Sequence, residues 1–282
     1  MRAIDVHCHL SVHDMMRVSI GPFNEEMEKY YKMKMPDKTI EEMANDFTAV
    51  DIKCMPTGWD AETNTGMPKF SNDKLAEYVK KFPDAFIGGW ACVDPLKGEE
   101  AIKEAKHAIK DLGLNGLKFQ QGVQGFAPNE KRFYPLWETC VELGCPVQFH
   151  TGSTGMGAGI AGGMGVHLKY YDPLMIDDIA ADFPTLKIIA LHPAYPWQEV
   201  MIAVLRHKGN VYNELSGYLP RRFPKELIQA IPELQDKIMM GSDYPAIIPA
   251  KWLDQFEKLG FGPEINEKVF IKNAQRILNL GD

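Results

Sequence analysis

Five residues that can bind a divalent metal ion fall where buried strands are expected to end. His7 and His9 form an HxH pair in AIDVHCH, and His150 ends PVQFH. His192 ends IIALH, and Asp243 follows IMMGS. Imidazole and carboxylate groups are common ligands of Zn, Mn and Fe. A bound ion can lower the pKa of water to about 7, which supplies hydroxide at neutral pH. These residue types therefore indicate metal-assisted catalysis.

The spacing of these residues favours one shared site. Residues two apart on an extended segment share a face, so His7 and His9 can point at one ion. A lone histidine at a strand end is more often a hydrogen-bonded core group, and HxH alone is a weak motif. Taken together, the pattern predicts one divalent ion bound by His7, His9, His150 and Asp243. We expect Zn, with Mn or Fe as alternatives.

Lys118, in GLKFQ, leaves several interpretations open. A buried lysine is costly without a partner, so its side chain is expected to face the active-site mouth or a carboxylate. It can form a structural ion pair, or it can be carboxylated and bridge a second metal ion. We favour a mononuclear site in which Lys118 orients the substrate or Asp243. His192 is the other candidate for a second-metal or substrate contact.

Short apolar runs that alternate with helical patterns supply the elements that position these residues. The expected strands cover residues 3–7, 51–56, 86–93, 116–119, 146–150, 187–192, 210–215 and 237–241. Several are apolar on both faces, as is typical of parallel strands buried on both sides. The expected helices cover residues 72–82, 99–112, 131–143, 174–183, 199–207 and 224–230, with a closing helix pair at 266–280.

Eight strand–helix repeats predict a single-domain (β/α)8 TIM barrel over residues 1–282. The length of 282 residues fits one such barrel, which typically needs about 250. An open doubly wound sheet is the alternative, but no GxGxxG follows the first strand. In a barrel the carboxyl ends of the strands meet at one mouth, where active sites are assembled. The metal site is therefore predicted at that mouth.

Two insertions are expected to lie at the mouth as loops. Residues 21–38 are rich in Met, Tyr and charge, and residues 152–165 are rich in glycine. Four residues near the expected mouth are candidate substrate contacts: His167, Tyr170, Trp197 and Arg221. Packing or surface exposure is the alternative for each of them.

Composition excludes several classes of partner. The net charge is −7 and no cluster of Lys or Arg forms a basic stripe, so nucleic-acid binding is not expected. The apolar runs are too short to cross a membrane. A strand begins almost at Met1, which leaves no room for a signal sequence, so a cytoplasmic protein is expected. Five scattered cysteines without a CxxC predict reduced thiols.

The segments DVHCHL, VQFHTG, LHPAYPW and MGSDYP resemble the amidohydrolase superfamily, in its amidohydrolase-2 branch. That branch includes aminocarboxymuconate-semialdehyde decarboxylase. The resemblance implies that His7, His9, His150 and Asp243 bind the metal and that His192 binds or polarises water or substrate. It also implies a homodimer.

A closer likeness covers GLKFQQGVQGFAPNEKRFYPLWE and NVYNELSGYLPRRFP. These segments resemble proteins labelled 4-hydroxyphenyl-β-ketoacyl-CoA hydrolases. His167 stands where those relatives carry Arg, which implies a different substrate if that Arg binds a substrate anion.

The leading hypothesis is metal-assisted hydrolysis of a small carbonyl or β-keto compound. Asp243 would take the proton of water and His192 would stabilise the oxyanion. The alternative is non-oxidative decarboxylation of an aromatic or enoic acid, with Asp243 or His192 handling the proton delivered to carbon. A metal-stabilised protein without turnover ranks last, because structural metal sites are usually closed and rich in Cys.

Overall fold

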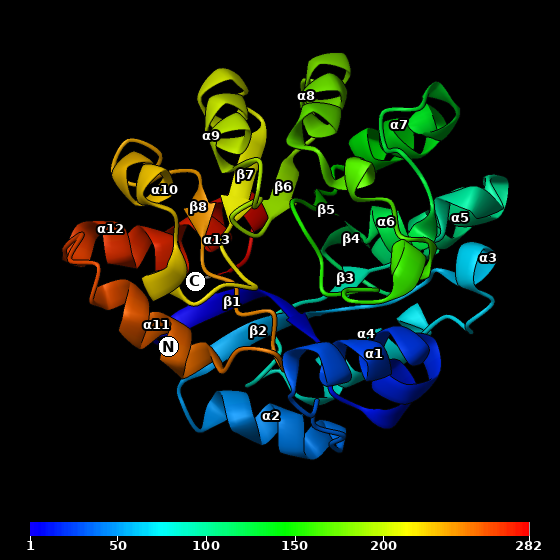
Figure 1. Cartoon of the computed structure of the whole chain (residues 1–282), viewed down its shortest axis with the longest axis horizontal. Coiled ribbons are helices and arrows are strands. Elements are labelled where there is room, and N and C mark those ends of the chain that lie inside the picture. The colour runs from blue at the N-terminus through cyan, green and yellow to red at the C-terminus, as the bar shows by residue number, and fades with distance from the viewer. Residues whose placement is uncertain (282) are drawn as a thin grey trace.

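Eight parallel strands pair in sequence order from first to last. The computed structural model describes residues 1–281. The strands are β1 (Ala3–His9), β2 (Ile52–Thr57), β3 (Trp90–Ala91), β4 (Gly116–Phe119), β5 (Val147–His150), β6 (Ile188–Leu191), β7 (Val211–Glu214) and β8 (Ile238–Met239). Figure 1 shows them at the centre of the molecule with helices around them.

The sheet closes between β1 and the segment that follows β8. Cys8 forms a parallel bridge with Tyr244. The Val6 amide donates to the Met240 carbonyl at 3.1 Å, and the His9 amide donates to the Tyr244 carbonyl at 2.7 Å. The predicted (β/α)8 barrel is therefore confirmed.

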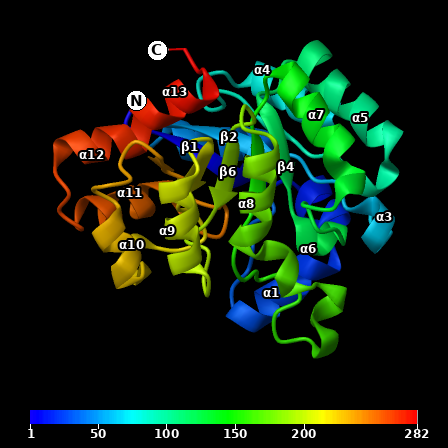
Figure 2. The ribbon, with the colours of Figure 1, turned by 90° about the horizontal axis from the view of Figure 1, so that it is seen from above.

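The helices lie outside the strands. They are α1 (Pro22–Tyr31), α2 (Ile40–Thr48), α3 (Glu62–Thr65), α4 (Asn72–Lys81), α5 (Glu99–Lys106), α6 (Gln121–Gln124), α7 (Tyr134–Leu143), α8 (Pro173–Asp182), α9 (Gln198–His207), α10 (Lys225–Ala230), α11 (Pro249–Glu257), α12 (Pro263–Glu267) and α13 (Asn273–Leu278). Figure 2 shows both chain ends at one end of the barrel and α1 at the other. None of the helices in residues 1–281 is long and apolar enough to cross a membrane.

Several predicted boundaries were wrong. The strand expected at 86–93 is paired only at Trp90–Ala91, after a Gly88–Gly89 step. The closing helix pair is one continuous helical run, because the π-helical turn Lys268–Lys272 joins α12 to α13. The segment 21–38 is not only loop, since it contains α1.

Two cores hold the barrel together. Inside the strands, apolar side chains such as Ile4, Val6 and Ile189 pack with Trp90, which is fully buried. The Trp90 indole N–H donates to the Val6 carbonyl at 2.8 Å, which satisfies its polar atom. A larger core lies between strands and helices. All five cysteines are buried and free, as predicted.

Candidate metal centre and active-site cavity

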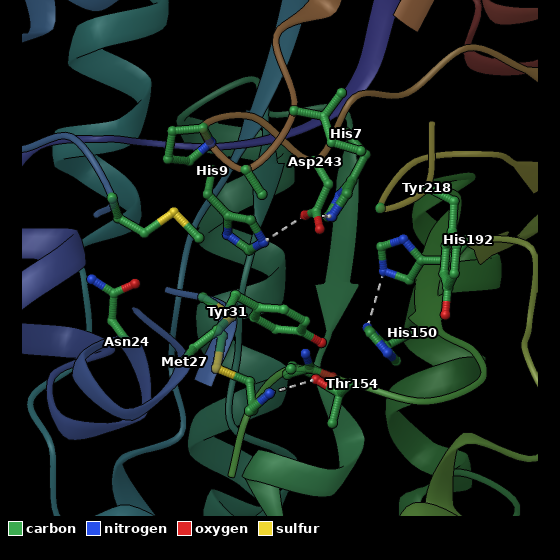
Figure 3. A pocket seen from close by; sticks show the side chains of 18 of the residues that line it. His7, His9, Asn24, Met27, Tyr31, His150, Thr154, His192, Tyr218 and Asp243 are labelled. Carbon is green, nitrogen blue, oxygen red and sulfur yellow. Dashed lines mark hydrogen bonds and ion pairs between the residues drawn. The ribbon is translucent and has the colours of Figure 1, made fainter. Parts of the chain in front are cut away.

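His7, His9 and Asp243 gather at the carboxyl end of the barrel. The Nε2 atoms of His7 and His9 lie 3.3 and 3.4 Å from Oδ1 of Asp243. One ligand atom from each residue lies within 4.8 Å of the other two. Figure 3 shows both rings turned toward the carboxylate. The structure thus brings these three predicted ligands together, and their binding of a metal ion stays a prediction.

The backbone fixes Asp243 in a conformation that L-residues rarely adopt. Its φ is 61°, and its amide donates to the His7 carbonyl at 3.0 Å. The preceding residue, Ser242, donates from its amide to Asp5 at 3.0 Å. Asp5 is fully buried, and burial raises its pKa to about 7. Strained residues of this kind cluster at functional sites, where the surroundings hold them.

The electrostatics of these three residues suit a metal ligand set. Burial lowers the pKa of His7 to about 3, although Asp243 opposes the shift, and burial also lowers the pKa of His9. Desolvation alone would raise the pKa of Asp243, but hydrogen bonds from His7 and His9 hold it well below its ordinary value. Two neutral imidazoles and one carboxylate are the protonation states that bind a cation.

The free atoms around this cluster fit a bound ion as well. The Nδ1 atoms of His7 and His9 are buried without a hydrogen-bond partner in residues 1–281, so neither ring is tied into another network. Asp243 leaves 24% of its side chain exposed to the cavity above. The residues present therefore fit a divalent cation with an open side for substrate.

His150 lies beside this cluster but outside the group of three. Its Nδ1 is 3.1 Å from Nε2 of His192, and its Nε2 is 3.1 Å from the Ser153 carbonyl oxygen. The His7 and His192 rings are 5.6 Å apart, so the His150–His192 pair borders the cluster. Ligation by His150 remains a prediction, and it requires Nε2 to leave the Ser153 carbonyl.

A buried network that the sequence analysis missed holds His192. Ser216 Oγ donates to Glu214 at 2.7 Å and lies 2.9 Å from Nδ1 of His192. The backbone amide of His192 donates to Glu214 at 3.1 Å. This bond holds the backbone of His192 at a φ of 74°, in the left-handed region. Burial raises the pKa of Glu214 well above its ordinary value. The sequence signal was a Glu at the end of an expected strand, followed two residues later by Ser.

The hydrogen-bond directions around Ser216 assign a tautomer to His192. The Ser216 hydroxyl hydrogen is used by Glu214, so Nδ1–H of His192 donates to Ser216. The Ser153 carbonyl can only accept, so its 3.1 Å contact with His150 requires a hydrogen on Nε2 of that ring. Binding of a metal through this Nε2 therefore requires loss of that contact and the tautomer protonated at Nδ1, which can donate to Nε2 of His192.

Lys118 is buried on β4 and faces the same cavity. Burial lowers its pKa to about 8, against the attraction of Cys92, Asp243 and Glu214. Its Nζ lies 5.3 Å from the Trp59 ring centroid. It forms no ion pair with any residue from 1 to 281, so the structural ion pair considered above is not formed. A cation without a partner is available for an anionic substrate.

A cavity of about 390 Å3 opens over these residues. The two predicted mouth insertions both line it, through Asn24, Met27 and Tyr31 on one side and Ser153 and Thr154 on the other. They also contact each other: a Cβ placed on Gly155 would lie 2.8 Å from the Met27 sulfur, and one on Gly159 would lie 2.5 Å from the Tyr30 ring. The two insertions therefore pack against each other beside the cavity, and we call the pair the roof of the cavity.

The four candidate substrate contacts lie away from the cavity lining. His167 is exposed and packs at 5.6 Å on Tyr170, while Trp197 precedes α9. Arg221 is exposed in the turn after β7. The neighbouring Arg222 lines the cavity in its place. Sequence position after a strand does not reveal which of two adjacent arginines turns inward.

The sequence of the chain matches a known protein family over almost its whole length. The sequence profile described as Amidohydrolase matches residues 4–280. The chain belongs to the amidohydrolase family. A 2-amino-3-carboxymuconate-6-semialdehyde decarboxylase of Dictyostelium discoideum is 28% identical over 156 residues. That match covers 52% of this amidohydrolase and 41% of the relative, so it spans less than half of the relative's length.

Two solved structures share the whole fold. An uncharacterised TIM-barrel protein from Bordetella bronchiseptica is 24% identical, with a TM-score of 0.80 and 99% coverage of both chains. The 5-carboxyvanillate decarboxylase of Novosphingobium aromaticivorans, complexed with manganese and 4-hydroxy-3-methoxy-5-nitrobenzoic acid, is 17% identical. Its TM-score is 0.71, with 99% of this chain and 96% of that chain covered.

The Dictyostelium discoideum relative and the Novosphingobium aromaticivorans protein are both named as decarboxylases. They give no support to the specific likeness to 4-hydroxyphenyl-β-ketoacyl-CoA hydrolases. The solved decarboxylase was complexed with manganese, and Zn in this chain remains a prediction.

Proposed function

We propose that this amidohydrolase is a metal-dependent, non-oxidative decarboxylase of a small aromatic or enoic acid. The observation that carries the proposal is the placement of Lys118 in the same cavity as the His7–His9–Asp243 cluster. A buried cation and a metal ligand set together suit a carboxylate better than a neutral carbonyl compound. The activities of the named relatives support the same choice.

The ligands of the ion would be His7, His9 and Asp243, with His150 as the fourth. When bound, the divalent ion supplies a fixed positive charge that attracts the carboxylate and a neighbouring oxygen of the acid. Lys118 adds a second cation at the same cavity and orients the carboxylate. Buried charges act strongly there because little water screens them.

Loss of CO2 leaves the bonding electron pair on the substrate carbon, which then needs one proton. Asp243 or His192 would deliver this proton. Because Asp243 is ionised and Nε2 of His192 carries no hydrogen in the tautomer described above, either group would first take the proton from solvent water. The network of Ser216 and Glu214 holds the His192 ring in one tautomer and one orientation. General acid–base groups that are oriented in this way contribute roughly 10²–10⁴-fold to rate.

Isotope labelling tests the proposal against hydrolysis. The Mn2+-loaded protein is incubated in D2O, and separately in 18O-water, with a panel of hydroxylated benzoates and enoic acids. We expect CO2 release and one deuterium on the product carbon that carried the carboxylate. Incorporation of 18O into a product carboxylate, without CO2, would establish hydrolysis in its place.

A further inference from the structure

The cavity extends well beyond the metal ligands, and one stretch of chain supplies the extension. Six apolar lining residues come from residues 16–35: Met16, Ile20, Met27, Tyr31, Met33 and Met35. This segment contributes no charged residue to the lining. Methionine side chains are flexible and polarizable, so they adapt to apolar groups of different shape. We call these six residues the methionine arm.

Asn24 places one polar group in the methionine arm. It lies on α1, lines the cavity and is 1% exposed. Its Nδ2 is buried and has no hydrogen-bond partner in the described part of the chain. A buried amide without a partner destabilises a fold, so such a group in a cavity points to a ligand.

The two ends of the cavity are separated in space. In Figure 3, Asn24 and Met27 lie on one side of the view with His9 above them, and His150 and His192 lie on the other side, with Tyr31 between. The cavity volume of about 390 Å3 falls within the range of pockets that enclose drug-sized ligands, roughly 300–1,000 Å3. An acid whose carboxylate lies at the metal centre can therefore carry a further group that reaches the methionine arm.

We propose that the methionine arm and Asn24 form a second recognition subsite for an elongated acid. The arm binds the apolar body of the substrate, and Asn24 donates a hydrogen bond to an acceptor oxygen on that body. This inference rests on the proposed function, because it places the carboxylate at the metal centre. It narrows the substrate class to aromatic or enoic acids with an apolar, oxygen-bearing extension.

Equilibrium binding to the Mn2+-loaded protein tests the subsite with three probes: benzoate, 4-butylbenzoate and 4-butanoylbenzoate. Each buried methylene favours binding by about fourfold, so 4-butylbenzoate should bind at least tenfold more tightly than benzoate. In the Asn24→Leu variant, 4-butanoylbenzoate should bind about fivefold more weakly than in the wild type. The affinity for 4-butylbenzoate should be retained or improved.

A matched variant and a second measurement separate binding from folding. Glu25→Leu introduces the same side chain at the next, exposed position of α1 and should leave all three affinities unchanged. The metal-free Asn24→Leu protein should unfold at the same or a higher temperature than the wild type, because the substitution removes an unpartnered amide. A lower unfolding temperature would make Asn24 a structural residue and overturn the inference.

The binding outcomes distinguish this inference from the proposed function. Equal affinities for benzoate and 4-butylbenzoate, or equal losses for both long probes in Asn24→Leu, would reject the subsite. Release of CO2 from short benzoates alongside that result would leave the decarboxylase proposal standing. Selective binding of the long probes without CO2 from any acid would retain the subsite and reject the decarboxylase.

Discussion

The tautomer of His192 depends on the hydroxyl group of Ser216. Ser216 Oγ lies 2.9 Å from Nδ1 of this histidine. Ser216→Ala should lower kcat on the order of 10²-fold, because the imidazole loses the bond that fixes its tautomer. The metal content per chain should not change, and Ser216→Thr should restore most of the rate. Loss of metal in Ser216→Ala, at unchanged kcat per bound ion, would assign Ser216 to metal binding.

Loss of the proton from Lys118 should make substrate binding depend on pH. Its pKa is lowered to about 8, so the amine is charged below that pH and neutral above it. If this charge binds the substrate carboxylate, KM should rise as the pH increases through about 8, whereas kcat changes less. Lys118→Met should raise KM at pH 7 and flatten the profile of KM against pH. A profile that is the same in both proteins would remove Lys118 from substrate binding.

At the scale of the elements, the turn after β7 must pass close to His192. Gly217 has a φ of 73°, and a Cβ there would lie 2.8 Å from Nδ1 of His192. Gly144 is a matched control, since its φ is 64° but a Cβ would have no atom within 4 Å. Both Ala variants should lose about 1–2 kcal/mol of unfolding free energy from the left-handed backbone.

Only Gly217→Ala should lower kcat, on the order of 10²-fold, because displacement of a catalytic group by about 1 Å has that effect. Steady-state kinetics and denaturant unfolding of the two variants provide the comparison. Equal kcat values in the two variants would show that the position of His192 is not critical.

Strands and helices were predictable from the sequence where the local pattern of apolar and polar residues determines the secondary structure. All eight strands lie within or beside their predicted ranges, because parallel strands buried on both faces read as short apolar runs. The helix α1 was not predicted, because five of the ten residues in PFNEEMEKYY are Asn, Glu or Lys and two of its apolar residues, Met27 and Tyr31, line the cavity. The helices α2, α3, α6 and α11 were also missed.

The site was predictable only in part. HxH spacing and strand-end positions predicted the cluster of His7, His9 and Asp243, because a barrel brings strand ends to one rim. The contact between Ser216 and His192 joins turns after different strands, and no local pattern encodes it. The orphaned amide of Asn24 is likewise a property of the assembled roof.

For the whole molecule, the proposed metal site lies where the barrel closes. His7 and His9 come from β1, and Asp243 follows β8. An ion bound by these residues would link the first strand to the segment that follows the last strand. At a free-ion concentration 100 times Kd, binding would stabilise the folded state by about 2.7 kcal/mol.

Thermal unfolding with and without chelator measures this effect. We expect a higher unfolding temperature for the Mn2+-loaded protein, and a smaller rise for His7→Ala and Asp243→Asn. An ion that raises the unfolding temperature equally in these variants would be bound at another place in the fold.

Anomalous diffraction at the manganese absorption edge tests the metal centre most directly. Crystals of the Mn2+-loaded protein should show one strong anomalous peak per chain, bonded to His7, His9 and Asp243, with His150 turned from Ser153 to complete the set. Two peaks at the mouth, or one peak bonded to none of these residues, would contradict the mononuclear centre on which the catalytic proposal depends.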